Sequence, residues 1–278
     1  MLRRVLRRRK SALAGAVILA VIALAALFAP ALAPYDPIKI RPGEALSPPS
    51  LAYPFGTDQY GRDILSRAMT GARLSLLTGL GAVAVALTAG VVVGLACGVA
   101  GGWTDLMVMR VVDIMMAFPG ILMALVVVAV LGQGTLNVML AVGVSLIPTF
   151  VRLVRGDVLS VRENAYVEAA RALGCWPTRV ALRHVLPNVV APIIVISTVA
   201  IAWSIILGAS LSFLGLGPRP PIPEWGIDLS GGRNYLLRAW WISSVPGFCI
   251  MLTVVAVNLV GDALRDELDP RLRSLANL

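Results

Sequence analysis

A serine nucleophile with a histidine base is the one catalytic pair that the residue types of this chain could supply. The serines lie in Gly208–Ser212 (GASLS), inside an apolar run, and the histidine is His184. If the run is helical, about six turns of 5.4 Å separate the two groups, whereas a nucleophile and its base must lie within hydrogen-bond reach. Small residues in an apolar helix are typical of close helix packing. We therefore expect no intramembrane protease site and no catalytic residue.

Sites for nucleotide phosphates and for metals also lack the residues they need. A P-loop requires GxxxxGK[ST], in which the lysine reaches the phosphates. The only lysines are Lys10 and Lys39, and neither follows a glycine. A zinc site requires about four Cys or His ligands, but the three cysteines are widely spaced and form no CxxC pattern. We expect this chain to bind no cofactor and no metal, and its cysteines give no support for a disulfide.

The composition predicts a membrane protein. Hydrophobic residues make up 58% of the 278 residues and charged residues only 14%, whereas soluble domains carry about 25% charged residues. The net charge of +9 could suggest nucleic acid, but the basic residues cluster at the N-terminus and between apolar runs, as topology signals do. We therefore expect a lipid bilayer and no nucleic acid among the partners of this chain.

Charge-free runs predict an all-α fold with six transmembrane helices, because a helix needs about 20 apolar residues to cross the bilayer. One long run contains LGQGTLN (Leu131–Asn137), whose two glycines and polar residues should break it into two helices joined by a tight turn. An apolar first run of this length predicts an uncleaved helix rather than a signal peptide, whose core spans about 7–15 residues. The predicted spans lie within Ser11–Tyr35, Leu74–Thr104, Ile114–Val151 (two helices), Val185–Pro218 and Ala239–Gly261.

The basic residues also predict an orientation. Sixteen of the 24 lysines and arginines fall on one side if the N-terminus is cytoplasmic, and the positive-inside rule then places both termini in the cytoplasm. The predicted spans carry no ionisable residue near their middle, since Asp105, Arg110, Asp113 and Asp262 lie toward span ends. Carriers driven by ion gradients usually bury such residues at mid-membrane. Any uphill transport should therefore be driven from outside this chain.

A charged insert separates the fourth and fifth predicted spans. Val158–Leu173 reads as one amphipathic helix, Gly174 as its C-terminal cap, and Pro177 as the start of a second short helix that ends before Pro187. Two interpretations remain open on the residues alone. The small side chains of Ala169, Ala170 and Ala172 and the Glu168 carboxylate could enter a partner's cleft, or the helix could lie on lipid with Glu168 paired to Arg171.

The insert resembles the EAA motif of binding-protein-dependent ABC importer permeases. EAARALG and the following HVLPN match that motif in register at Glu168, Ala169, Ala170, Gly174, Leu186 and Pro187. His184 departs from the isoleucine of the broad pattern, although the peptide branch of the family is similar there. FGTDQYGRDILSR (Phe55–Arg67), LSFLGLG, PEWG and NLVGDALRDELDPRLR extend the resemblance over nearly the whole chain. The sequence is most similar to the second permease subunit of the dipeptide/oligopeptide/nickel family.

The resemblance implies a type I transmembrane domain at residues 73–267, preceded by residues 1–72 with the first helix and an external segment, and followed by a cytoplasmic tail at 268–278. Residues 158–187 would couple to an ATPase. The implied partners are a second homologous permease, two ATP-binding subunits that hold ATP and magnesium, and an extracytoplasmic solute-binding protein, all at a bacterial or archaeal inner membrane. Peptides are the expected solute and nickel the alternative. A self-sufficient ion-driven carrier and a non-transporting scaffold are more remote alternatives, and the substrate path remains unassigned.

The external segments also have plain structural interpretations. Gly56, Thr57, Asp58 and Gly61 suit a capped turn before a helix, and Asp63 and Arg67 could form an i,i+4 pair. Aromatic residues are enriched at membrane interfaces. We expect such a belt from Trp225, Trp240 and Trp241.

Overall fold

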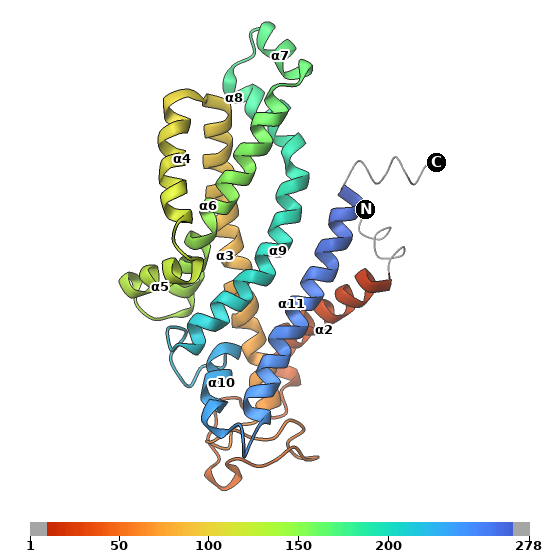
Figure 1. The fold of residues 1–278 in the computed structure, drawn as a ribbon. Coiled ribbons are helices and arrows are strands. Elements are labelled where there is room, and N and C mark those ends of the chain that lie inside the picture. Colours follow the sequence, from red (N-terminus) through yellow and green to blue (C-terminus); the bar gives the residue numbers. More distant parts are fainter. Residues whose placement is uncertain (1–9, 269–278) are drawn as a thin grey trace.

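The computed structural model describes residues 10–268 as a bundle of helices, and the basic segment 1–9 and the tail beyond residue 268 lie outside the described residues. Most of the helices run along one axis, with α7 at one end of the bundle and α10 near the other (Figure 1). The only β-pairing among residues 10–268 is the isolated bridge between Thr57 and Asp63. The α-helices are α2 (Lys10–Leu32), α3 (Ile64–Ala100), α4 (Gly102–Met116), α5 (Gly120–Leu131), α6 (Thr135–Arg162), α7 (Ala165–Ala172), α8 (Pro177–Val180), α9 (Leu186–Phe213), α10 (Trp225–Gly232) and α11 (Trp241–Leu268).

Five stretches are long and apolar enough to cross a membrane: α2, α3, α6, α11 and the continuous helix Pro177–Phe213. The pair α4–α5 makes a sixth if it is taken as one broken span, with a bend of 95° between its halves. The bend falls at Ala117–Pro119, because proline lacks an N–H and disfavours helical geometry in the residue before it. The predicted break between the third and fourth spans is confirmed at Gly132–Gly134, where Gly132 and Gly134 both have positive φ.

The predicted boundaries of the second and third spans are wrong. Helix α3 begins ten residues before the predicted start, at Ile64, and ends at Ala100, and α4 starts at Gly102 rather than near Ile114. Asp105, Arg110 and Asp113 therefore lie within the first half of the third span, not before it. The sequence analysis missed α4 because it counted only runs without charged residues, and α4 contains three of them.

Two ion pairs explain how α4 accommodates its acidic residues. The Asp105 carboxylate accepts hydrogen bonds from Arg155 of α6, at 2.5 Å from Nε and 2.6 Å from Nη2. Arg152 of α6 donates to Asp113 further along α4, and both of those side chains are about half exposed. Pairing offsets part of the cost of removing a charge from water. The two pairs fix α4 beside α6.

Glycines let α3 and α6 approach closely. Gly90, Gly94 and Gly98 recur every four residues on one face of α3, which is the small-xxx-small spacing of tightly packed membrane helices. A Cβ atom at Gly94 would lie 2.8 Å from the carbonyl oxygen of Val151, and one at Gly90 would lie 2.3 Å from Cβ of Phe150. Neither position has room for a side chain. This pair makes the most extensive helix contact in the described fold.

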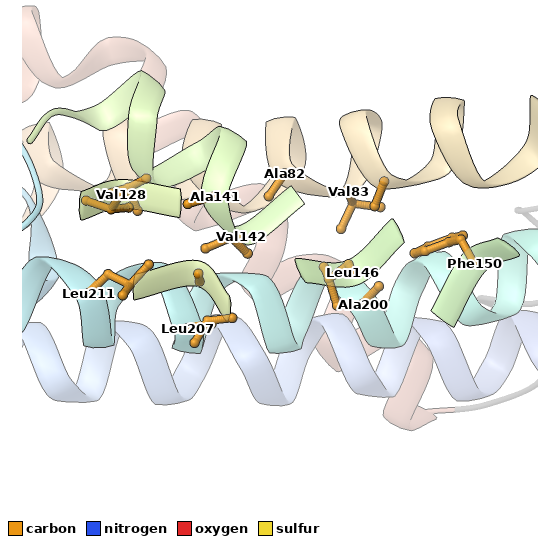
Figure 2. Packing of buried hydrophobic residues seen from close by; sticks show 13 residues of the cluster. Ala82, Val83, Val128, Ala141, Val142, Leu146, Phe150, Ala200, Leu207 and Leu211 are labelled. Carbon is orange, nitrogen blue, oxygen red and sulfur yellow. The ribbon is translucent and has the colours of Figure 1, made fainter. Parts of the chain in front are cut away.

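The main apolar core lies where α3, α5, α6 and α9 meet. Figure 2 shows Val83 of α3, Val142 and Phe150 of α6, and Leu207 and Leu211 of α9 gathered along these helices. Phe150 and Leu211 are fully buried. The short α5 adds Ala124 and Val128 to the same cluster, so the broken span packs against the bundle through this half.

Buried polar contacts join α3, α10 and the neighbouring loops at the end of the bundle where α10 lies. Arg67, only 3% exposed, donates from Nε to Asp228 of α10 at 3.0 Å and from Nη1 to the backbone oxygens of Pro37 and Pro221. The predicted Asp63–Arg67 pair is therefore wrong. Asp63 instead caps α3 by accepting from the backbone N–H of Ser66 at 2.8 Å. The predicted capped turn before α3 is confirmed, with positive φ at Gly56 and Gly61.

The predicted tryptophan belt is wrong for two of its three members. Trp225 and Trp241 are buried and donate their indole N–H groups to the backbone oxygens of Ala68 and Thr57, each at 3.0 Å. Both therefore pack α10 and α11 against the start of α3 and the segment before it. Of the three, only Trp240 is exposed. Buried indoles are stabilised when their N–H finds an acceptor, and only the tertiary fold supplied these acceptors.

A buried carboxyl at this end predicts a pH dependence of stability. Glu224 accepts from the backbone N–H groups of Gly226 and Ile227 and from the Ser75 hydroxyl, each at 3.0 Å. Burial nevertheless raises the pKa of Glu224 above its ordinary value. The folded state then binds more protons than the unfolded state, so stability should fall as the pH rises from about 4.3, the ordinary pKa of glutamate, through the raised value.

Glu224→Gln should flatten this decline, because glutamine does not titrate. The measurement is thermal unfolding of the detergent-purified protein between about pH 4 and pH 8. Glu44→Gln, at an exposed position near the same end, is the matched control and should leave the decline unchanged. Equal pH slopes for the wild type and Glu224→Gln would contradict the assignment.

Candidate functional site

The 158–187 segment leaves the bundle at the end of α6 and returns as α9. The predicted single helix Val158–Leu173 is wrong, because α6 continues to Arg162 and a separate α7 begins at Ala165. Asn164 lies between them with extended backbone, and its side-chain amide donates to the carbonyl of Val161 at 3.0 Å. Asparagine competes for backbone groups in this way and so favours helix ends. The break lets α7 turn away from the α6 axis at the end of the bundle (Figure 1).

The turn after α7 agrees with the sequence prediction, but the connection from α8 to α9 does not. Gly174 has φ +79°, the left-handed conformation expected of a glycine cap, and Pro177 occupies the first turn of α8. The predicted end of the second helix before Pro187 is wrong. Helix α8 continues through a π turn at Ala181–Val185 into α9, so Leu186 and Pro187 stand in the first turn of α9. Pro187 has no N–H to donate inside this continuous helix, and π turns and prolines are both recognised causes of irregular helix geometry.

A second apolar cluster fixes this segment to the bundle. Val167 of α7, Val180 of α8 and Val185 of the π turn are each at most 1% exposed, and they pack with Val154 and Val158 of α6. The cluster also includes Leu95 of α3. The segment is thus joined to α3, α6 and α9 by buried contacts.

The six residues singled out by sequence divide into exposed and inward-facing ones. Glu168, Ala169, Gly174 and Pro187 are exposed or partly exposed, and Leu186 is buried in part against the second cluster. Ala170 is only 7% exposed and belongs to the interior of this chain, so it positions α7 rather than presenting a surface to a partner. Within residues 10–268 the Glu168 carboxylate has no ion-pair or hydrogen-bond partner, and no pair with Arg171 forms.

Two large apolar side chains at the tip were missed by the sequence reasoning. Leu173 is 85% exposed and Trp176 is 79% exposed, on either side of the Gly174 turn. Tyr166, on the first turn of α7, is also exposed. The signal was available in the sequence, because a leucine and a tryptophan flank the glycine turn within an otherwise charged segment. Clustered exposed apolar residues mark interaction surfaces.

A polar hollow lies beside Glu168. It has a volume of about 480 Å³ and is lined by the charged residues Arg162, Glu163, Glu168 and Arg171 together with Val99 and apolar residues of the turn. Arg162 also donates to the carbonyl of Gly98 at 3.0 Å, which ties the end of α6 to α3. No group of three or more His, Cys, Asp or Glu residues that could hold a metal occurs between residues 10 and 268.

A substitution at Gly174 should test the geometry of this turn. Valine at φ +79° is strained by about 1–3 kcal/mol, so Gly174→Val should displace α7 relative to α8 and make the turn more accessible to protease. Gly156→Val in α6 is the matched control, because open space surrounds that position and its φ is not positive. The measurement is the rate of limited proteolysis within residues 158–187. A wild-type rate for Gly174→Val would contradict the role of the turn.

Two family models match the chain. Residues 90–274 match the binding-protein-dependent transport system inner membrane component, and residues 1–49 match the N-terminal TM domain of oligopeptide transport permease C. The first match covers most of the helical bundle and the whole 158–187 segment.

This chain aligns with curated relatives over almost its full length. The chain is 44% identical over 273 residues to the di/tripeptide transport system permease protein DppC of Pseudomonas aeruginosa, covering 96% of this chain and 90% of the relative. It is also 44% identical to the dipeptide transport system permease protein DppC of Alkalihalophilus pseudofirmus (97% and 88% covered) and to the glutathione transport system permease protein GsiD of Escherichia coli O6:K15:H31 (96% and 88% covered). These relatives are membrane permease subunits rather than enzymes. The helical bundle, the match over residues 90–274 and the relatives lead to one conclusion: this chain belongs to the family of binding-protein-dependent transport system inner membrane components.

Proposed function

We propose that this chain is one of two permease subunits of an ATP-driven peptide importer, and that its 158–187 segment docks on a separate ATPase. The observation that carries the proposal is the exposed tip formed by Glu168, Leu173 and Trp176 on a base held by buried valines. An apolar tip with an unpaired carboxylate is suited to a protein groove. On lipid headgroups, by contrast, the basic residues of an interfacial helix would be expected to make the polar contacts.

The other subunits of the transporter follow from this assignment. A second homologous permease would share the solute path, two ATP-binding subunits would hold ATP and magnesium, and an extracytoplasmic solute-binding protein would deliver the solute at the α10 end. The α7 end then faces the cytoplasm of a bacterial or archaeal cell, with both termini on that side of the inner membrane. The excess of lysine and arginine on that side supports this orientation.

The solute we propose is a short peptide. The names of three relatives support this, since they transport dipeptides, di- and tripeptides or glutathione. All of these solutes carry peptide or peptide-like bonds and free carboxylates. The alternative of a nickel complex has no support from these relatives.

Assembly and uptake together test the proposal. Co-expression with a cognate ATPase and binding protein should give a complex that survives mild detergent with a stoichiometric nucleotide-binding subunit. In liposomes the complex should take up dialanine only with ATP and the binding protein. Uptake by this chain alone under an ion gradient would establish a self-sufficient carrier instead. Purification without any ATP-binding partner would favour a scaffold.

Cysteine accessibility tests the orientation. A single cysteine introduced at Leu173 in a cysteine-free variant should react with a membrane-impermeant maleimide only after the cells are opened. One introduced at Leu237, which is fully exposed near the α10 end, should react in intact spheroplasts. The reverse pattern would place the 158–187 segment outside the cell and remove the basis for coupling.

A further inference from the structure

A cavity at the α10 end is separate from the 158–187 segment and has no assigned role. It has a volume of about 360 Å³, within the range of about 300–1,000 Å³ that small-molecule pockets occupy. Its lining comes from the turn before α3 and the start of α3, the turn between α5 and α6, the end of α9 with the loop after it, α10 with the residues that follow it, and the start of α11. It therefore exists only because these distant segments meet.

The charges around this cavity do not balance. Its two acidic residues are already paired, Asp58 with Arg62 at 2.6 Å and Asp228 with Arg67. Two further arginines of the lining, Arg219 and Arg233, are exposed. Within the described part of the chain, neither guanidinium has an ion-pair or hydrogen-bond partner. The cavity thus carries two uncompensated positive charges.

A buried hydrogen-bond acceptor without a partner places a second requirement on any ligand of this cavity. Gln59 lines the cavity, and its side-chain oxygen is buried without a hydrogen-bond partner within residues 10–268. Such a group is costly unless something donates to it. A half-turn of this amide would exchange its oxygen and nitrogen, and would bring the oxygen beside Gly231, another residue of the lining. Asn234 and Gln133, which also line the cavity, add further amide groups that can both donate and accept.

We infer that this cavity binds a small solute that carries both a carboxylate and an N–H donor, as a short peptide does. Arginine suits carboxylates because its planar fork can donate two parallel hydrogen bonds. A glutamate or aspartate side chain from a docked protein would satisfy the arginines but would leave the Gln59 oxygen unpaired, since a carboxylate only accepts. The inference rests on the proposed function and adds a solute site on the outer face of the permease.

The test compares two solutes that differ only in the carboxylate. The complete transporter with its binding protein is reconstituted in liposomes, and uptake of dialanine and of dialanine amide is measured over a range of loaded binding protein. The double variant Arg219→Gln/Arg233→Gln removes the free charges. Arg238→Gln is the matched control, because Arg238 is exposed near the same end but does not line the cavity.

A solute site predicts a change in kcat that depends on the solute. Losing charge-assisted hydrogen bonds should lower kcat for dialanine about tenfold in the double variant and leave kcat for the amide unchanged. Arg238→Gln should match the wild type, and Arg219→Lys/Arg233→Lys, which keeps the charge but not the two-donor fork, should recover part of the dialanine rate. The recovery also excludes loss of folding as the cause.

Three results would overturn the inference. An equal rise in KM for the loaded binding protein with both solutes would assign the arginines to protein docking. Unchanged kinetics in the double variant would leave the cavity without a role in transport, while the proposed function would stand. Absence of ATP-dependent dialanine uptake by the wild-type complex would contradict both the solute site and the proposed function.

Discussion

Glu168→Lys should lower ATP-driven solute uptake about thirtyfold while membrane insertion and thermal stability stay unchanged. The Glu168 carboxylate is exposed and has no partner within residues 10–268, so the folded subunit does not depend on it. At a protein interface, truncating one member of a buried charge pair costs about 2–5 kcal/mol, and about 2 kcal/mol corresponds to this factor. A lysine would add repulsion to the loss.

The measurements are ATP-dependent uptake, ATPase activity and recovery of the ATPase on purification. Uptake should fall more than ATP hydrolysis, because a weakened contact still permits the ATPase to turn over without moving the permease. Asp262→Lys is the matched control: it reverses the charge of an exposed carboxylate on α11, outside the 158–187 segment, and it should retain most of the uptake. Normal uptake by Glu168→Lys would count against the coupling assignment.

The variant Trp176→Ala tests the apolar part of the exposed tip separately from the Glu168 charge. Trp176 is 79% exposed, so its removal should not destabilise the subunit. Tryptophans at interface centres often contribute about 2 kcal/mol or more to binding. We therefore expect the ATPase to dissociate from this variant more readily in detergent than from the wild type.

Gly94→Leu should prevent the subunit from folding into its native bundle. A side chain at this position would meet the backbone oxygen of Val151 at 2.8 Å and Cβ of Val154 at 2.8 Å. Backbone atoms cannot rotate away as a side chain can, so α3 and α6 would have to separate along their whole contact. Overpacking in cores costs about 1–3 kcal/mol, and we expect this variant to lie at or above the upper end of that range.

Gly156→Leu provides the control for this substitution. Gly156 is a helical glycine of α6, and a Cβ atom added there would have nothing within 4 Å. Replacing it should slightly stabilise the helix, because glycine is a poor helix former. The measurements are the yield of monodisperse protein from membranes and the thermal unfolding temperature in detergent. Equal behaviour of Gly94→Leu and Gly156→Leu would show that the α3–α6 contact is looser than the structure indicates.

Some of the fold could be predicted because its causes are local. The break at Gly132–Gly134 and the left-handed turn at Gly174 were both predicted from residue type. The start of α8 at Pro177 was predicted in the same way. These features depend on backbone freedom, which a residue carries with it wherever it stands in a fold.

The candidate site was predicted in part. The EAA residues located the segment and the exposed Glu168, but they did not distinguish Ala170, which is buried, from Ala169, which is exposed. Nor did they reveal the tip residues Leu173 and Trp176. A motif gives the order of residue types, whereas the face that each residue occupies depends on where α6 ends and how α7 packs on it.

The sequence by itself determined the membrane class and the position of the 158–187 segment between two apolar helices, because the cost of placing each residue in lipid adds up along the chain. Only the tertiary structure decided that Arg67 pairs with Asp228, 161 residues away, rather than with Asp63, and that Trp225 and Trp241 are buried. It also decided that α4 keeps its aspartates within the span by pairing them with arginines of α6. Such contacts depend on the meeting of distant helices, and close packing at the glycines of α3 is what brings α3 and α6 together.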